Sequence, residues 1–386
     1  MPVKNRFAEL LPEITAWRQD LHAHPEILFD THRTAAIVAQ KLNDIGCDEV
    51  VTGIGRTGVV GVIKGKSDTS GKVIGLRADM DALPIHEATG LDYASKTEGA
   101  MHACGHDGHT AMLLGAAKYL SETRNFDGTV VVIFQPAEEG GGGGREMCAD
   151  GMMDRFGIQE VYGMHNWPGM PVGAFAIRTG AFFAATDQFE ITVTGKGGHA
   201  AKPHETVDSI VVAAHMITAL QTIASRNADP VDQIVVSVTS IESSSNAFNV
   251  IAQQTHLKGT IRTMSNDMRT LGEARLTAIA KGACAALGAV ADVKYYHGYP
   301  CMVNHDDQTT FAASVAAKVA GVCDDAPLIM GGEDFAYMLQ ERPGAYILVG
   351  NGDSAAVHHP EYNFNDEAIP AGCSWWAGIV EDRMPV

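Results

Sequence analysis

Three histidines, a thiol and a carboxylate are packed into nine residues, Met101 to His109 (MHACGHDGH). In an extended segment alternate side chains point the same way, so we expect Cys104 and His106 to face one spot. A thiolate beside an imidazole suits zinc or a related transition metal. Gly105 and Gly108 would let the backbone bend tightly around an ion or into a helix. A buried cysteine with helix-start histidines is the alternative, but metal ligands are usually grouped and core histidines are not.

Four apolar runs each end in residues suited to metal or proton chemistry. They are Val73–Leu76 before Arg77-Ala78-Asp79-Met80-Asp81, Thr129–Phe134 before Gln135-Pro136-Ala137-Glu138-Glu139, Val161–Met164 before His165-Asn166, and Leu328–Met330 before Gly331-Gly332-Glu333-Asp334. Continuous apolar runs are typical of parallel strands covered on both faces. In open α/β sheets, functional sites form at the carboxyl ends of such strands. The pattern therefore predicts a site at that edge of a parallel sheet.

The candidate metal ligands are Cys104, His106, Glu139, His165 and one of His358 and His359. Five ligands exceed the four of a tetrahedral zinc ion, which indicates two ions bridged by water or a shared side chain. Glu138 and Glu139 would point opposite ways in an extended segment, so one can bind metal while the other acts as general base. Metal binding lowers the pKa of water from about 15.7 to roughly 7. A solvated charged turn is the alternative for this glutamate pair.

Further residues are candidates for supporting roles. Asp79 and Asp81 could each be a metal ligand, a residue that orients a ligating histidine, or a solvated loop residue, and we expect Asp79 to orient a ligating histidine. His199, in a glycine-rich turn, could donate to a developing oxyanion or be an ordinary turn histidine. Arg262, with Asn249 upstream, could hold a substrate carboxylate or be a solvated charge at a strand end. The five glycines at 140–144 indicate a linker or a permissive loop beside the site.

Composition narrows the possible partners and location. A chain of 386 residues should form about two domains. The net charge of −18 argues against nucleic acid or an anionic membrane as the main partner. Seven scattered cysteines make no disulfide framework and favour a reducing compartment. With no signal peptide and no membrane-spanning run, a cytoplasmic location is expected.

The hydrophobic pattern changes between residues 186 and 297. Alternating strands and two long helices follow the order β-α-β-β-α-β, which matches the ferredoxin-like split motif. The sequence therefore predicts an α/β protein in two parts. The main domain, residues 1–185 and 298–386, is expected to contain a mostly parallel sheet with helices on both faces. A ferredoxin-like βαββαβ domain is inserted at 186–297. Open edges in so small a sheet invite pairing with another chain.

Taken in order, these motifs resemble the metal-dependent aminoacylase/carboxypeptidase family of amidohydrolases, in particular its hippurate hydrolase and auxin-conjugate hydrolase branch. The resemblance covers nearly the whole chain and rests on these segments: Arg18–Glu26, Arg77–Pro84, Met101–His109, Gln135–Gly140, Gly163–Asn166, Gly195–Ala201, Gly332–Phe335 and His358–Pro360. It implies hydrolysis of the amide bond of N-acyl amino acids at a dinuclear site. The implied ligands are Cys104, His106, Glu139, His165 and His358, with Glu138 as general base.

The resemblance also implies that the inserted domain is a lid that mediates dimerisation and contributes His199 to a neighbouring active site. Asn249 and Arg262 match lid positions that contact substrate. Two departures from the family pattern stand out. The wider family has a His-x-Asp motif where this chain has Arg77-Ala78-Asp79, so that ligand set does not carry over. The usual proline after the Asn-Val-Ile stretch is Ala252.

Several alternatives remain open at this point. The expected metal is zinc or manganese, with nickel or cobalt as alternatives. In related sequences the ligand is the residue two before the proline, which favours His358 over His359. A dipeptidase or carboxypeptidase, or an N-acetyl-diaminopimelate-type deacetylase, would differ only in substrate. A non-catalytic metal-binding member would have no use for Glu138.

Overall fold

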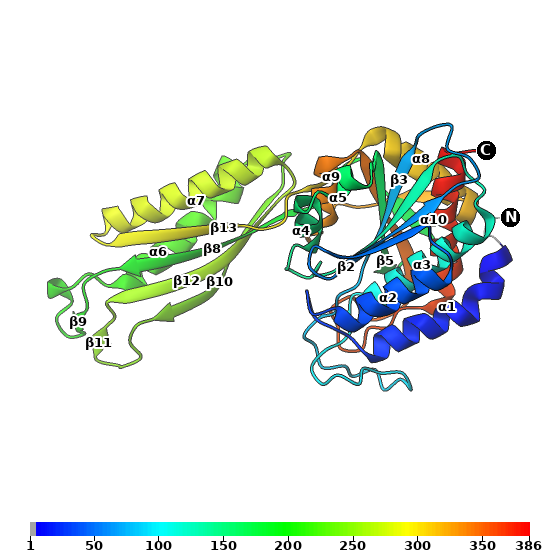
Figure 1. Cartoon of the computed structure of the whole chain (residues 1–386). Coiled ribbons are helices and arrows are strands. Elements are labelled where there is room, and N and C mark those ends of the chain that lie inside the picture. Colours follow the sequence, from blue (N-terminus) through cyan, green and yellow to red (C-terminus); the bar gives the residue numbers. More distant parts are fainter. Residues whose placement is uncertain (1–4) are drawn as a thin grey trace. The chain divides into compact units, whose positions relative to one another are not determined.

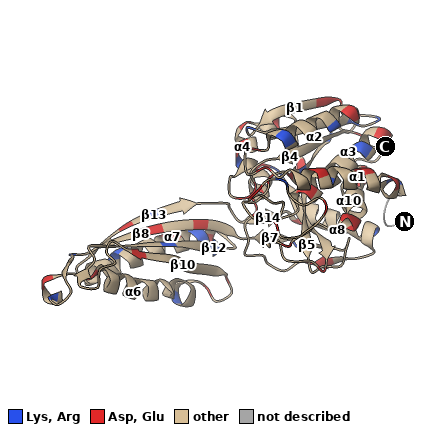
Figure 2. Ribbon diagram, turned by 90° about the horizontal axis from the view of Figure 1, so that it is seen from below, with Lys and Arg blue, Asp and Glu red and all other residues tan. Residues whose placement is uncertain are grey.

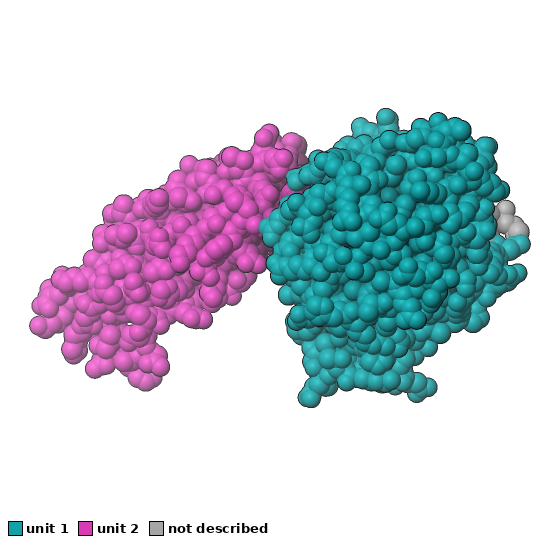
Figure 3. All heavy atoms as spheres, viewed as in Figure 1, with its two compact units in different colours: residues 1–180, 303–327, 334–386 teal, residues 181–302, 328–333 magenta. Residues whose placement is uncertain are grey.

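A computed structural model describes residues 5–386, and the chain divides into two compact units (Figures 1 and 3). Unit 1 comprises the residues up to Gly180, Val303–Pro327 and Asp334–Val386. Unit 2 comprises Ala181–Met302 and Leu328–Glu333. The sequence prediction placed the insertion at 186–297 and assigned the short second segment of unit 2 to the main domain.

Unit 1 is built on an eight-stranded sheet with the order β1-β2-β4-β3-β5-β16-β6-β15. The strands are β1 (Glu49–Ile54), β2 (Gly58–Lys64), β3 (Val73–Asp79), β4 (Thr129–Gln135), β5 (Glu160–Pro168), β6 (Phe175–Ile177), β15 (Cys323–Asp325) and β16 (Gly344–Gly352). β4, β3, β5 and β16 run parallel to one another, whereas β1, β2 and β6 introduce antiparallel pairs. The mostly parallel sheet predicted from the apolar runs is therefore confirmed.

Helices cover both faces of this sheet. They are α1 (Asn5–Ala23), α2 (His32–Asp44), α3 (His106–Thr123), α4 (Gly143–Ala149), α5 (Met152–Arg155), α8 (Asp306–Ala320), α9 (Phe335–Glu341) and α10 (Ile369–Arg383). On β4, Val130 and Val132 face the core cluster that includes α3. The alternate residues Val131 and Ile133 are also fully buried. Burial on successive residues means that both faces are covered, with α4 and α9 contacting β4 and β5.

Three details of the sheet differ from the sequence analysis. The run Leu328–Met330 is not a strand of this sheet, because it is short and lies between Pro327 and Gly331; Ile329 makes only an isolated bridge. The fourth parallel strand is β16 instead. β1 was missed, and β4 lies between β2 and β3, which are consecutive in the sequence.

Unit 2 has the predicted order of elements: β8 (Ala185–Thr194), α6 (Ser209–Leu220), β10 (Ile234–Ser243), β12 (Gln254–Thr263), α7 (Asn266–Ala286) and β13 (Val290–His297). The strands form an antiparallel sheet in the order β10-β12-β8-β13, as in ferredoxin-like folds. Phe189, Ile191 and Val193 of β8 are buried in one core with residues of both helices. The side chains of Asp208 and Ser265 cap α6 and α7.

A second sheet in unit 2 has only two short strands, β9 (Gly198–His199) and β11 (Val250–Ile251). Short 3₁₀ and π turns occupy Pro203–Glu205 and Ile223–Asn227, and another 3₁₀ turn, Asp366–Ala368, precedes α10 in unit 1. Two further strands, β7 (Gly180–Phe183) and β14 (Met302–Asn304), lie where the chain passes between the units.

The surface carries more acidic than basic side chains, as the 46 acidic and 28 basic residues require. Figure 2 shows Asp and Glu spread over helices and loops of both units, with Lys and Arg between them. Within residues 5–386, no helix is both long and apolar enough to cross a bilayer.

Candidate metal centre

Cys104 and His106 are brought together by a sharp bend at the start of α3, not by an extended segment. Gly105 has a φ of 89° immediately before His106, the first residue of the helix. A Cβ atom at Gly105 would lie 2.3 Å from Asn166 Nδ2 and 2.4 Å from Tyr362 Oη. The positive φ and this close approach both require glycine. The two side chains do converge, but through a glycine bend rather than strand alternation.

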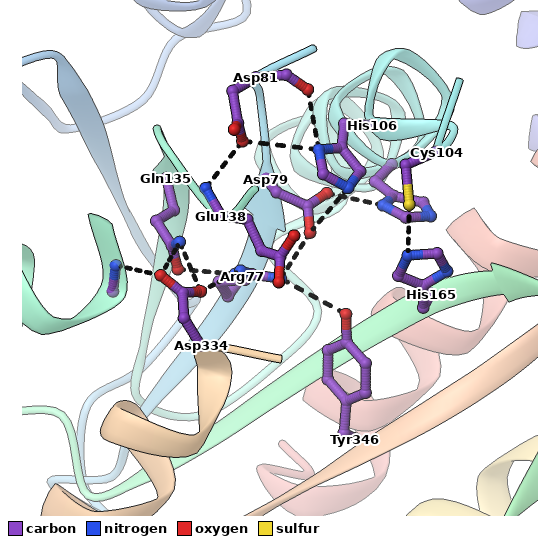
Figure 4. Close-up of polar contacts among 12 residues, drawn as sticks. Arg77, Asp79, Asp81, Cys104, His106, Gln135, Glu138, His165, Asp334 and Tyr346 are labelled. Atoms are coloured by element: carbon purple, nitrogen blue, oxygen red, sulfur yellow. Dashed lines mark hydrogen bonds and ion pairs between the residues drawn. The ribbon is translucent and has the colours of Figure 1, made fainter. Parts of the chain in front are cut away.

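Cys104, His106 and His165 form a cluster in which a ligand atom of each lies within 4.8 Å of the others (Figure 4). Cys104 Sγ lies 3.3 Å from His165 Nε2. His106 Nδ1 donates to the carbonyl oxygen of Asp81 at 2.8 Å, and His165 Nδ1 donates to that of Asn166 at 2.6 Å. An imidazole fixed in this way presents its Nε2 atom to another partner. Among the described residues, the buried His106 Nε2 has no hydrogen-bond partner.

The turn after β4 carries Glu138 and Glu139 and is held by Asp81. The two carboxylate oxygens of Asp81 accept the backbone N–H groups of Glu138 and Glu139, at 2.9 and 3.1 Å. Ala137 has a φ of 53°, a strained value for a residue with a side chain. A ligand atom from each of His106, Glu138 and Glu139 lies within 4.8 Å of the others. Asp81, whose role the sequence left open, therefore orients the glutamate pair.

The glycine run 140–144 is not a linker: Gly140–Gly142 form a loop folded back on this turn, and Gly143 and Gly144 begin α4. Gly140 and Gly142 have φ values of 91° and 71°, in the left-handed region. A Cβ atom at Gly143 would lie only 1.8 Å from the carbonyl oxygen of Pro136. The absence of side chains in this run therefore lets the backbone at Gly143 pack directly against Pro136, where the chain enters the turn.

His358, and not His359, reaches the site. His358 Nε2 lies 3.3 Å from Glu139 Oε1, and a cluster within 4.8 Å joins His358, Glu139 and Cys104. His358 also has a positive φ of 67°, a strained backbone conformation of the kind found at functional sites. The Nδ1 atom of His359 instead accepts the N–H of Glu361 at 3.1 Å.

The electrostatics of the cluster favour a bound cation. Burial raises the pKa of the Cys104 thiol well above its usual range, and carboxylates, Glu139 foremost, raise it further. Burial alone would lower the pKa of His106, but the carboxylates around it, led by Asp79, raise it to about 10. Burial lowers the pKa of His165 well below its usual value, so this ring is neutral. A divalent cation would balance the carboxylates and allow the thiol to ionise.

Asp79 orients a histidine, but a different one from that expected. It is fully buried and accepts hydrogen bonds from His109 Nδ1 and Arg77 Nη1, both at 2.6 Å. The candidate ligand His106 has its Nε2 3.8 Å from the carboxylate of Asp79. His109 Nε2 accepts the backbone N–H of Asn166 at 2.8 Å. Since both ring nitrogens of His109 are occupied, His109 is unsuited to bind metal.

Asn166, which the sequence placed at the end of an apolar run without a role, and Tyr362, which it did not identify, have structural roles at the site. The side-chain amide of Asn166 donates to the carbonyl oxygen of Cys104 at 2.6 Å, and its oxygen accepts the Tyr362 hydroxyl at 2.6 Å. These bonds tie the Cys104 segment to the end of β5. Asn166 follows His165 directly at the end of an apolar run, which was an available signal. Tyr362 lies in an irregular segment with no such signal.

In unit 2, His199 and Asn249 lie side by side. His199 pairs with Val250 across β9 and β11, and the carbonyl oxygen of Asn249 accepts the N–H of Ala200 at 2.9 Å. His199 and Asn249 are both exposed. His199 Nδ1 accepts the N–H of Ala201 at 3.1 Å, so the neutral ring carries its proton on Nε2 and can donate it.

Arg262 lies far from these two residues within unit 2. It is half-buried on β12, and its Nη1 donates to Thr260 Oγ1 at 2.6 Å. Gln254, at the start of β12, is adjacent to the small sheet that bears His199. Arg262 is eight residues further along the strand, which corresponds to about 27 Å. The structure therefore does not bring Arg262 together with His199 and Asn249.

The residues present fit a pair of divalent metal ions. Overlapping groups within 4.8 Å contain all the predicted ligands: Cys104, His106, Glu139, His165 and His358. Thiolate, imidazole and carboxylate are the ligands that zinc and related ions use. His106 Nε2 and Glu139 Oε1 are both buried without a hydrogen-bond partner in the described part of the chain, and a metal ion would satisfy them.

Comparisons with known proteins agree on one family. Residues 75–382 match the model of Peptidase family M20/M25/M40. The chain is 41% identical over 377 residues to hippurate hydrolase of Campylobacter jejuni, covering 96% of this chain and 97% of the relative. It is 37% identical to N-acetylcysteine deacetylase of Bacillus subtilis, with 94% of each covered. A Bacillus subtilis structure described as a dinuclear metal binding peptidase from the M20 family superimposes with a TM-score of 0.86 at 33% identity, covering 98% of this chain and 99% of that one.

The family model covers residues 75–382, and the hippurate hydrolase is 41% identical over 96% of this chain. The chain therefore belongs to peptidase family M20/M25/M40, and its prediction as a metal-dependent amidohydrolase is confirmed.

Proposed function

We propose that this protein hydrolyses the amide bond of N-acyl amino acids, such as N-benzoyl or N-acetyl derivatives, to a carboxylic acid and a free amino acid. The observation that carries the proposal is Glu138, held by Asp81 within 4.8 Å of His106 and Glu139. A base beside candidate ligands is the arrangement that metal-assisted hydrolysis requires. The similarity to a hippurate hydrolase and an N-acetylcysteine deacetylase supports this choice of substrate class.

Two divalent metal ions would be held by Cys104, His106, Glu139, His165 and His358. We propose zinc or manganese, with nickel or cobalt as alternatives. When bound, the ions would polarise the acyl carbonyl and lower the pKa of water. Asp81 fixes His106 from behind through its carbonyl oxygen, so the ring does not rotate when its Nε2 engages a ligand.

Glu138 acts as the general base and then as the general acid. Its carboxylate accepts a proton as water attacks the acyl carbon, and it returns that proton to the departing amide nitrogen. Glu139 is instead assigned to the metal, because its Oε1 faces the candidate ligand His358 at 3.3 Å. Asp79 acts on neither the water nor the substrate; it orients His109, which in turn fixes the Asn166 segment.

The decisive test replaces Glu138 with Gln and measures hydrolysis of N-benzoyl, N-acetyl and dipeptide substrates with each candidate metal. The change preserves shape but removes the base, so kcat should fall about 10²–10⁴-fold, with the metal content unchanged by elemental analysis. A kcat within a few-fold of wild type would contradict the role of Glu138. Preference for dipeptides in the wild-type panel would instead move the assignment to a dipeptidase or carboxypeptidase. Preference for N-acetyl-diaminopimelate, added as a further substrate, would indicate a deacetylase of that type.

We further propose that unit 2 is a lid that pairs with another copy of the chain and supplies His199 and Asn249 in trans. Arg262 pairs with Thr186, close to where the chain enters unit 2 at Ala181. His199 lies at the other end of the sheet. Phe248, beside Asn249, is fully exposed, which supports a role for this end in binding. Arg262 would then contact substrate from the end near the chain connection.

Complementation tests the shared site. Glu138→Gln and His199→Ala chains, each inactive alone, are mixed so that subunits exchange. In a heterodimer with sharing in trans, one site carries both lesions and the other carries neither, so about half of the wild-type activity per heterodimer should return. If mass spectrometry shows exchange and no activity returns, His199 does not act in trans.

A cytoplasmic location also stays a proposal. All seven cysteines are free, which is consistent with a reducing compartment.

A further inference from the structure

Arg77 is a fully buried cation whose partners surround the turn that carries the proposed base. Its guanidinium donates to Gln135 Oε1 at 2.9 Å, to Asp79 Oδ2 at 2.6 Å and to Asp334 Oδ1 at 2.9 Å. A buried charge is tolerated only when it is paired and its donors are satisfied. Its three nitrogens each bind a different side chain, which a lysine ammonium could not reproduce in a planar fork.

Asp334, at the start of α9, connects this cation to the glycine loop. Its carboxylate accepts from Arg77, from Gln135 Nε2 at 2.7 and 2.9 Å, and from the backbone N–H of Gly144 at 2.8 Å. A Cβ atom at Gly144 would lie 2.9 Å from the carbonyl oxygen of Asp334, so the contact is close along the backbone as well. The loop thus ends on a buried carboxylate whose position Arg77 sets.

The turn is therefore held at two points. Near its middle, Asp81 accepts the N–H groups of Glu138 and Glu139; at its end, Asp334 accepts that of Gly144. A carboxylate oxygen of Glu138 lies within 4.8 Å of one of Asp334. Figure 4 shows Arg77 and Asp334 on the side of Glu138 away from Cys104 and His165.

We propose that Arg77 and Asp334 are positioning residues that fix the 136–144 turn and thereby place Glu138 for proton transfer. This inference rests on the proposed role of Glu138 as base. The Arg77–Asp334 pair acts through the turn and contributes no metal ligand. A displacement of Glu138 by about 1 Å is enough to lower kcat on the order of 10²-fold.

If the Arg77–Asp334 pair only stabilised the fold, kcat would follow the Tm. A double variant separates this case from a positioning role. Arg77→Met or Asp334→Leu alone leaves a buried charge unpaired and should lower the Tm. The double variant removes both charges of this pair, and such replacements are often neutral for stability. Asp79 still loses the Arg77 guanidinium, so the Tm should rise above that of Arg77→Met without reaching the wild-type value. The kcat of the double variant should stay about 10²-fold below wild type because the Gly144 anchor is lost, while KM changes less than about threefold and the metal content is unchanged. Recovery of kcat together with Tm would overturn the proposal.

Arg77→Lys covers the case in which the double variant does not fold. It keeps the buried charge but loses the fork, so the chain should fold, retain its metals and show a reduced kcat at unchanged KM; wild-type kcat would overturn the proposal.

Arg383→Met is the matched control, since Arg383 also pairs with a carboxylate in unit 1, through Nε to Glu160 at 2.8 Å. It should lower the Tm without changing kcat. Activity in Glu138→Gln would refute the proposed base, whereas an inactive Glu138→Gln with fully active Arg77 and Asp334 variants would refute only this inference.

Discussion

Replacing Gly143 with Ala should disable the site through a backbone displacement of known minimum size. The new Cβ atom would lie 1.8 Å from the carbonyl oxygen of Pro136, and a Cβ atom essentially never comes within 3.0 Å of a non-bonded heavy atom. One of the two segments must therefore move by about 1.2 Å. Pro136 is two residues before Glu138, so the shift falls on the turn that carries the base. At the usual sensitivity of catalysis to misplacement, kcat should drop about 10²-fold.

Gly140→Ala is the matched control in the same loop. Gly140 has a φ of 91°, but nothing lies within 4 Å of its would-be Cβ atom. Alanine there costs about 1–2 kcal/mol of backbone strain without a collision. We expect a lower denaturant midpoint and a kcat within about threefold of wild type.

The assay is steady-state hydrolysis of an N-acyl amino acid, with the metal content and the unfolding midpoint measured on the same samples. If Gly143→Ala keeps its kcat while the midpoint falls, the turn yields elsewhere and its fixed position is not needed for catalysis. If Gly140→Ala loses as much activity as Gly143→Ala, the strain matters more than the collision, and the steric reasoning is wrong.

Three other outcomes follow from the structure. Cys104→Ser should reduce the metal bound per chain, because a neutral hydroxyl replaces an anionic thiolate; full occupancy by elemental analysis would remove Cys104 from the ligand set. His358→Ala should lower metal content whereas His359→Ala should largely spare it, and the reverse would move the ligand by one residue. In unit 2, burial would raise the pKa of Asp187, but Arg269 and Tyr295 hold it below its usual value. The Asp187 carboxylate therefore stabilises the fold above about pH 4, and this effect is lost as pH falls further. Asp187→Asn should destabilise β8 by about 1–3 kcal/mol at pH 7. It should also weaken the acid dependence of amide hydrogen exchange in β8.

The parallel core of the sheet could be predicted because its strands are buried on both faces and read as uninterrupted apolar runs. The order of the strands could not. β16 pairs with β5, although the intervening chain includes all of unit 2. No local pattern specifies a partner at that sequence distance.

The ligand types could be predicted because thiol, imidazole and carboxylate side chains cluster in short motifs after strands. Their geometry was harder to foresee. Gly105 brings Cys104 and His106 together through a positive φ; the sequence indicated a tight bend at this glycine, but it also predicted an extended segment that the structure does not have. The choice of His358 over His359 depended on family resemblance, and a strained backbone now accounts for it.

The supporting network was beyond the sequence because its members are remote from one another. Arg77 and Asp334 are separated by 257 positions and meet only in the folded chain. In the sequence, Arg77 was only a departure from the His-x-Asp motif of the wider family. Its burial and its bonds to Gln135 and Asp334 give it a physical role.

The position of β16 beside β5 has a consequence for folding during synthesis on the ribosome. β5 is complete at Pro168, but its neighbour β16 ends only at Gly352, about 180 residues later. At ordinary translation rates this edge of an apolar strand stays open for about 10 to 40 s on the ribosome. All of β8 to β13 is synthesised in that interval, and this contiguous unit can fold before its host sheet closes. The growing chain thus exposes a strand edge of the kind that chaperones protect, and a chain released before Gly352 would carry a folded unit 2 beside an unfinished sheet.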